Sequence, residues 1–99
     1  MLTITKNIAP SAATFHLAGR LDTITAPDFE KELKPALAGL KELTLDFAGL
    51  EYISSAGLRV LLATQKVMNR QGAMQILNVN ETIMEIFEVT GFSDILTIG

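Results

Sequence analysis

Two adjacent serines, Ser54 and Ser55, are the side chains of this chain best placed to do chemistry. They follow the alternating apolar run 43–47, which is typical of a buried strand, and precede a long segment with helical spacing that begins near Ala56. A helix start exposes unpaired backbone N–H groups and the positive end of the helix dipole. It therefore suits a serine cap and equally suits an added phosphate. Two interpretations stay open: one serine only caps the helix, or the pair is a modification site.

Other residues offer little support for catalysis. His16 is the only histidine and alternates with Phe15 and Leu17, so we expect it on the solvent face or at the edge of a strand. An enzyme with Ser54 or Ser55 as nucleophile would have no other plausible base. The chain has no Cys, which excludes a thiol nucleophile and a thiolate metal site. Neither a P-loop nor a dinucleotide-binding glycine motif occurs.

Three acidic residues, Asp22, Asp46 and Glu51, follow expected strand ends and could in principle hold Mg²⁺. No spacing between them requires a metal, and solvated loop carboxylates are the commoner explanation of such residues. We therefore assign no catalytic residue, no metal ligand and no cofactor, and expect a protein that is not an enzyme.

Composition indicates one globular domain over residues 1–99. Apolar residues make up 48% of the chain and charged residues 19%, which excludes a disordered chain. The net charge is −3 with eight scattered basic residues, so no direct nucleic-acid partner is expected. No apolar run approaches the roughly 20 residues of a membrane span, and the N-terminus does not read as a signal peptide. We expect a cytoplasmic protein without a membrane partner. The hydrophobic pattern does not predict an oligomeric state.

Hydrophobic periodicity predicts an α/β fold with the order β-β-α-β-α-β-α and a possible final strand. A first strand beginning at Leu2, a turn over 7–12 and a strand over 13–19 form an antiparallel hairpin. Parallel β-α units should follow with right-handed crossovers, giving a mixed sheet of four to five strands packed with helices. The first expected helix covers 26–34, with Thr25 as its cap and Pro35 as a kink or the start of a separate turn. A strand over 41–47 and a loop over 48–53 follow, and then a helix from 56 to Gly72. The remaining segments are a strand over 74–79, a helix from an Asn80 cap to Gly91, and a short strand over 94–98.

Four motifs in this order resemble the STAS family, which includes the bacterial anti-anti-sigma factors (anti-sigma factor antagonists). The motifs are Gly19-Arg20-Leu21-Asp22, Leu45-Asp46-Phe47, Ile53-Ser54-Ser55-Ala56-Gly57-Leu58, and Phe87-x-x-x-Gly91-Phe92. The resemblance covers residues 2–98, and the serine segment is its most specific part.

The resemblance implies a switchable binding protein for transcription regulation. Free-standing members bind an anti-sigma factor that is often also a serine kinase of the histidine-kinase-like ATPase type, and so release a sigma factor. The kinase phosphorylates a serine in the turn before the second long helix, which ends binding, and a PP2C-type phosphatase restores it. The alternative implied by the same resemblance is a STAS module of another signalling or transport-regulating assembly, one that could bind a nucleotide or lipid.

Carried onto this chain, the phosphorylated serine is Ser55, and Asp22 matches the acid that contacts the partner. Many members have Asp immediately before the phosphoserine, where this chain has Ser54, so Ser54 is the alternative site. The partner-binding residues expected from the resemblance are Asp22, Thr23, Ser54, Ser55, Ala56, Gly57 and Arg59.

Overall fold

The protein is described by a computed structural model that covers residues 1–99. It begins with the expected hairpin: β1 (Leu2–Ile8) pairs antiparallel with β2 (Ala12–Leu21), in a register that starts at Leu2 and Gly19. Strand β2 continues two residues beyond the predicted end. This extension lengthens β2 at its carboxyl end, and Asp22 follows directly after it.

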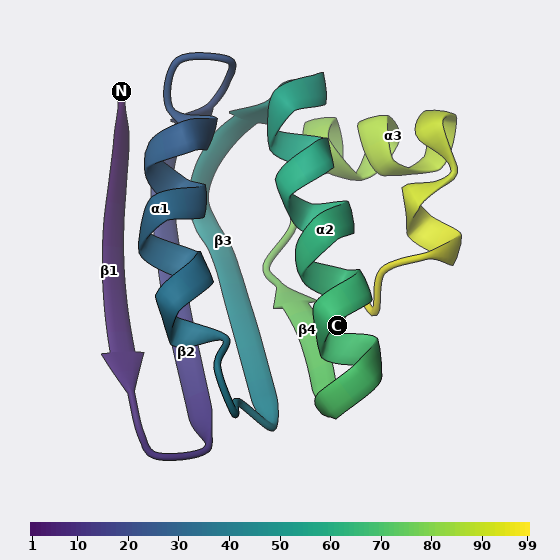
Figure 1. The fold of residues 1–99 in the computed structure, drawn as a ribbon. Coiled ribbons are helices and arrows are strands. Elements are labelled where there is room, and N and C mark those ends of the chain that lie inside the picture. Colours follow the sequence, from purple (N-terminus) through teal and green to yellow (C-terminus); the bar gives the residue numbers. More distant parts are fainter.

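The sheet has four strands in the order β1-β2-β3-β4, and the prediction of a mixed α/β fold is confirmed. Strand β3 (Glu42–Ile53) runs parallel to β2, and β4 (Ala73–Leu77) runs parallel to β3. The two crossover helices, α1 (Ala26–Ala36) and α2 (Ser55–Gln71), lie on the same face of the sheet (Figure 1). None of the helices has the length and apolar character needed to cross a membrane.

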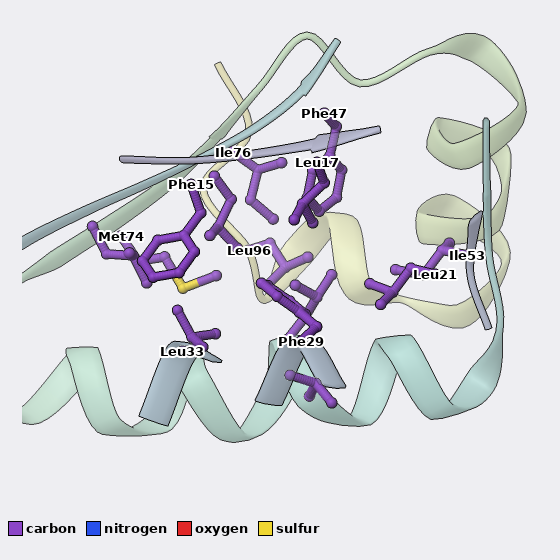
Figure 2. Packing of buried hydrophobic residues seen from close by; sticks show 14 of the residues in the cluster. Phe15, Leu17, Leu21, Phe29, Leu33, Phe47, Ile53, Met74, Ile76 and Leu96 are labelled. Atoms are coloured by element: carbon purple, nitrogen blue, oxygen red, sulfur yellow. The ribbon is translucent and has the colours of Figure 1, made fainter. Parts of the chain in front are cut away.

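The core lies between this face of the sheet and the helices. Alternate residues of β2, such as Phe15 and Leu17, are buried and point toward α1 (Figure 2). The rings of Phe15 and Phe29 meet edge to face with centroids 6.4 Å apart. Burial of each such side chain contributes about 1.5–3 kcal/mol, so this layer fixes α1 and α2 against the strands.

The prediction of a loop over 48–53 is wrong, because β3 continues to Ile53. Strand β3 carries one extra residue relative to β2 between Asp46 and Gly49, and another between Leu50 and Tyr52. These bulges change the spacing of its buried residues, which are Leu43, Leu45, Phe47, Leu50 and Ile53. A bulge breaks the two-residue period by which a strand is recognised, so the second half of β3 resembles a loop in sequence.

Two further expectations are corrected. Helix α1 runs through Pro35 to Ala36 and does not end at Lys34. Pro35 lies in the last turn, where the missing N–H removes only one intrahelical bond. The expected strand over 94–98 is absent as such: a short 3₁₀ helix η1 (Phe92–Asp94) is followed by an isolated parallel bridge between Ile98 and Ile76.

Helix α3 (Glu81–Thr90) begins and ends as its sequence predicts. The Ile83 backbone N–H donates to the Asn80 Oδ1 atom at 2.8 Å, so Asn80 caps the helix. The Asn80 side-chain amide also donates to the carbonyl of Leu50 at 2.9 Å, which ties α3 to the second half of β3. Gly91 follows the helix with φ +82°, a left-handed conformation that glycine adopts without strain.

Candidate functional site

The candidate site lies at the carboxyl ends of β2 and β3. Leu21 and Ile53 are the last register pair of these two strands. Immediately beyond them, the Ser54 backbone N–H donates to the Leu21 carbonyl oxygen at 2.9 Å. Helices α1 and α2 begin at this same end of the sheet (Figure 1). The fold therefore brings the Asp22 loop, defined as residues 22–25, beside the start of α2.

The two serines occupy different positions at the start of α2. Ser54 is the N-cap residue, with extended φ −100° and ψ 176°, but its side chain makes no capping bond. Its Oγ atom is buried and has no hydrogen-bond partner in the chain. The expectation that a serine hydroxyl caps this helix is therefore wrong for both residues, because Ser55 is already the first helical residue. Ser55 is exposed to solvent, whereas Ser54 is half-buried.

The first turn of α2 favours a negatively charged group. It contains no acidic residue, and no side chain accepts a hydrogen bond from its backbone N–H groups. These groups and the helix dipole give the turn a partial positive charge. The exposed hydroxyl of Ser55 stands at this point.

Gly57 allows the first turn of α2 to approach the sheet. A Cβ atom at this position would lie 2.8 Å from Ile53 Cγ1 and 2.8 Å from Leu21 Cγ, which is closer than carbon atoms pack. Both neighbours are fully buried. The small residue is therefore required by packing, and it sets how close Ser55 lies to the ends of the strands.

Asp22 organises its own loop. The backbone N–H groups of Ile24 and Thr25 each donate to Asp22 Oδ1 at 3.0 Å. The hydroxyl of Thr25 donates to the carbonyl of Arg20 at 2.8 Å and accepts from the Asp22 backbone N–H at 2.9 Å. Thr25 does not cap α1 by its side chain as predicted, because its hydroxyl is used within the loop.

The loop contacts also lower the pKa of Asp22 below its ordinary value of 3.8. The backbone N–H of Thr25 is the largest cause; desolvation acts in the opposite direction, and the Ile24 N–H adds to the lowering. The carboxylate thus stays ionised and holds the loop in one shape. Its Oδ2 atom lies 3.9 Å from the Nε atom of Arg20.

Three residues at this end of the sheet were not singled out from the sequence as site residues. Arg20 lies over the ring of Tyr52 from the neighbouring strand, with its Cζ atom 4.4 Å from the ring centroid. Ile24 is 83% exposed at the tip of the Asp22 loop. A lone isoleucine within a polar connection is the signal that could have identified Ile24. The pairing of Arg20 with Tyr52 depends on the bulge in β3 and has no sequence signature.

A hollow of about 270 Å³ separates the first turns of α1 and α2. It is lined by Thr23, Ala26, Pro27, Glu30, Ala56, Arg59 and Val60. Three of the residues expected from the sequence, Thr23, Ala56 and Arg59, thus share one depression. Together with Asp22, Ser54, Ser55 and Gly57, they place the whole predicted set at one end of the domain.

The remaining chemical candidates lie elsewhere. His16 lies five residues before the end of β2, roughly 16 Å along the strand, and its Nδ1 atom is 3.2 Å from Asp46 Oδ2. The pKa of Asp46 is lowered, chiefly because the Asn78 side-chain amide donates to its carboxylate, with the Ala48 N–H and His16 as further causes. No three His, Asp or Glu side chains form a group that could hold a metal ion. Asp22, Asp46 and Glu51 therefore do not constitute one site.

Comparisons with known proteins show the family and the fold of this chain. The family model described as the STAS domain matches residues 3–99. The anti-sigma-B factor antagonist of Bacillus subtilis (strain 168) is 30% identical over 85 residues, which are 85% of this chain and 78% of that protein. The crystal structure of an anti-sigma factor antagonist from Mycobacterium paratuberculosis superimposes with a TM-score of 0.89, at 19% identity over 99% of this chain and 85% of that one. The structure of the Bacillus cell fate determinant SpoIIAA in its phosphorylated form gives a TM-score of 0.74, at 16% identity over 100% of this chain and 91% of that one.

Proposed function

The chain belongs to the STAS domain family, and we propose that it is an anti-sigma factor antagonist switched by phosphorylation of Ser55. In its unmodified form it binds an anti-sigma factor that is also a serine kinase of the histidine-kinase-like ATPase type. Binding releases a sigma factor for transcription. Phosphorylation of Ser55 ends binding, and a PP2C-type phosphatase restores it. The protein acts in the cytoplasm as a binding protein and not as an enzyme.

The observation that carries this proposal is the position of Ser55. It is the exposed first residue of a 17-residue helix whose first turn has neither a side-chain cap nor an acidic residue. A kinase can reach such a hydroxyl without unfolding the chain. The curated relative that is 30% identical is named an antagonist of an anti-sigma factor, which supports the same class of function for this chain.

A phosphate at this position would change binding without disturbing the fold. It adds about −1.5 to −2 charges. Within the domain, the helix N-terminus favours a negative charge by roughly 0.3–1 kcal/mol. Across an interface, a desolvated charge that faces an acidic or apolar partner surface costs several kcal/mol. Since every 1.4 kcal/mol or so is tenfold in affinity, one modification is enough to abolish the complex.

The proposed interface combines the Asp22 loop with the start of α2. The loop contributes Thr23 and the exposed Ile24 on a backbone that is held by the Asp22 carboxylate. A preordered loop loses little conformational entropy on binding, which favours affinity. Asp22 serves the interface through this ordering, and its Oδ2 atom is left for the partner or for Arg20.

Phosphopeptide mass spectrometry on protein isolated from its own cells tests the switch. Trypsin should release residues 42–59 as one peptide, whose hydroxyl groups are those of Thr44, Tyr52, Ser54 and Ser55. Phosphate on Ser55 would support the proposal. Phosphate on Ser54 would keep the mechanism and move the site by one residue. An unmodified peptide under all growth conditions would overturn the switch and favour a constitutive STAS module of another assembly.

A further inference from the structure

Arg59 is a surface cation without an acidic partner. Its side chain is exposed on α2, four residues after Ser55. The three ion pairs of the structure join Lys6 to Glu32, His16 to Asp46 and Arg20 to Asp22, so Arg59 takes part in none of them. The remaining basic residue near the site, Arg20, already contacts the ring of Tyr52.

Helix geometry makes Arg59 and Ser55 neighbours on the surface of α2. Residues four apart are neighbours on a helix surface, with Cβ atoms about 5–6 Å apart. Side chains on a helix lean toward its N-terminus, so the Arg59 side chain is able to reach the turn that contains Ser55. An acidic group one turn before a basic group is also the favourable order for such a pair. The planar guanidinium can donate two parallel hydrogen bonds to phosphate oxygens.

The surroundings of Ser55 offer hydrogen-bond donors to a phosphate and contain no acidic residue that pairs with Arg59. The backbone N–H groups of the first turn donate to no side-chain cap, and the Ser54 Oγ atom is buried without a hydrogen-bond partner. No acidic residue lies in that turn. Glu30 of α1 lines the same hollow as Arg59, but it makes no ion pair with it.

We propose that Arg59 binds the phosphate of phosphorylated Ser55 within the same helix. The inference rests on the proposed function in taking Ser55 as the modified residue. It assigns Arg59 a regulatory role beyond a contact with the partner: the arginine leaves the hollow it shares with Thr23 and Ala56 and pairs with the phosphate. Phosphorylation therefore removes a cation from the binding surface at the same time as it adds an anion.

A ³¹P NMR titration of protein with phosphoserine incorporated at position 55 during translation tests the pair. A guanidinium beside the phosphate stabilises the dianion, which lowers the second pKa of the phosphoserine. Arg59→Gln should raise the titration midpoint by about 0.15–0.4 of a pH unit relative to the parent protein. Arg59→Lys should give an intermediate midpoint, because lysine keeps the positive charge but cannot donate two parallel hydrogen bonds from one planar group.

Two matched variants control the experiment. Arg70→Gln removes the same charge from the last turn of the same helix and should leave the midpoint unchanged. Arg20→Gln removes the other arginine at this end of the sheet. An unchanged midpoint in Arg59→Gln would overturn the inference, as would a rise in Arg20→Gln equal to that in Arg59→Gln. The titration needs neither kinase nor partner, so its outcome is separate from that of the phosphopeptide experiment.

Discussion

The backbone N–H of Ser54 donates to the carbonyl oxygen of Leu21 at 2.9 Å. This bond follows the last register pair of β2 and β3 and fixes where α2 begins. The residue after Leu21 is Asp22, whose carboxylate shapes the loop on the other side of the site. A backbone hydrogen bond therefore joins the turn of the proposed phosphorylation site to the strand end from which the proposed partner loop begins.

Gly57→Ala should destabilise the protein. The added methyl group would lie 2.8 Å from Ile53 Cγ1 and from Leu21 Cγ, and overpacking of this kind costs about 1–3 kcal/mol. Helix propensity alone gives the opposite sign, since Ala is favoured over Gly in a helix by about 1 kcal/mol. Urea unfolding measures the difference in the free energy of unfolding. A variant as stable as the parent or more stable would show that the first turn of α2 is not closely packed.

Asp22→Asn should lower stability at neutral pH, and the difference from the parent should vanish in acid. The folded-state pKa of Asp22 lies below its ordinary value of 3.8, so its contribution is fully present above that value and is lost as the pH falls through the lower, folded-state pKa. Thermal unfolding of both proteins between about pH 7 and pH 2 gives the two curves. Glu85→Gln, which alters an exposed carboxylate without hydrogen-bond partners on α3, is the control. A difference that persists unchanged in acid would mean that the loop does not depend on the ionised carboxylate.

Ile24→Ala should weaken partner binding without affecting the fold. Ile24 is 83% exposed on a loop that is already ordered, which is the arrangement of an interface anchor. We expect affinity for the proposed anti-sigma factor to fall about tenfold, equivalent to about 1.4 kcal/mol. Val89→Ala on α3 truncates an apolar side chain that is 88% exposed and should bind like the parent. Equal losses in the two variants would place the interface elsewhere.

The length of β3 shows where sequence periodicity fails. Residues 43–47 alternate and were correctly predicted as strand, whereas residues 48–53 have buried positions three apart. The extra residues in β3 relative to β2 are properties of strand pairing, which one strand alone does not reveal. The same bulges place Tyr52 beside Arg20, a contact that therefore could not be anticipated.

The site was predictable in its position but not in its hydrogen bonds. The pair of serines before a helical pattern placed the start of α2 within one residue, at Ala56 instead of Ser55, because helix starts carry local sequence signals. Which hydroxyl forms a cap depends on side-chain direction. The Ser54 hydroxyl is buried without a partner, and the Thr25 hydroxyl bonds to the Arg20 carbonyl instead of capping α1. The sharing of one hollow by Thr23 and Arg59 likewise follows from the packing of α1 beside α2.

The affinity of Ser55 variants for the proposed anti-sigma factor kinase tests the central claim most directly. Isothermal titration should give a dissociation constant for Ser55→Ala close to that of the parent, and one for Ser55→Asp at least about tenfold weaker. The melting temperatures should stay close to that of the parent, because the start of α2 tolerates a negative charge. Ser54→Asp and Ser54→Ala report on the neighbouring hydroxyl. Equal affinities of Ser55→Ala and Ser55→Asp would contradict the proposal that a negative charge at Ser55 controls binding.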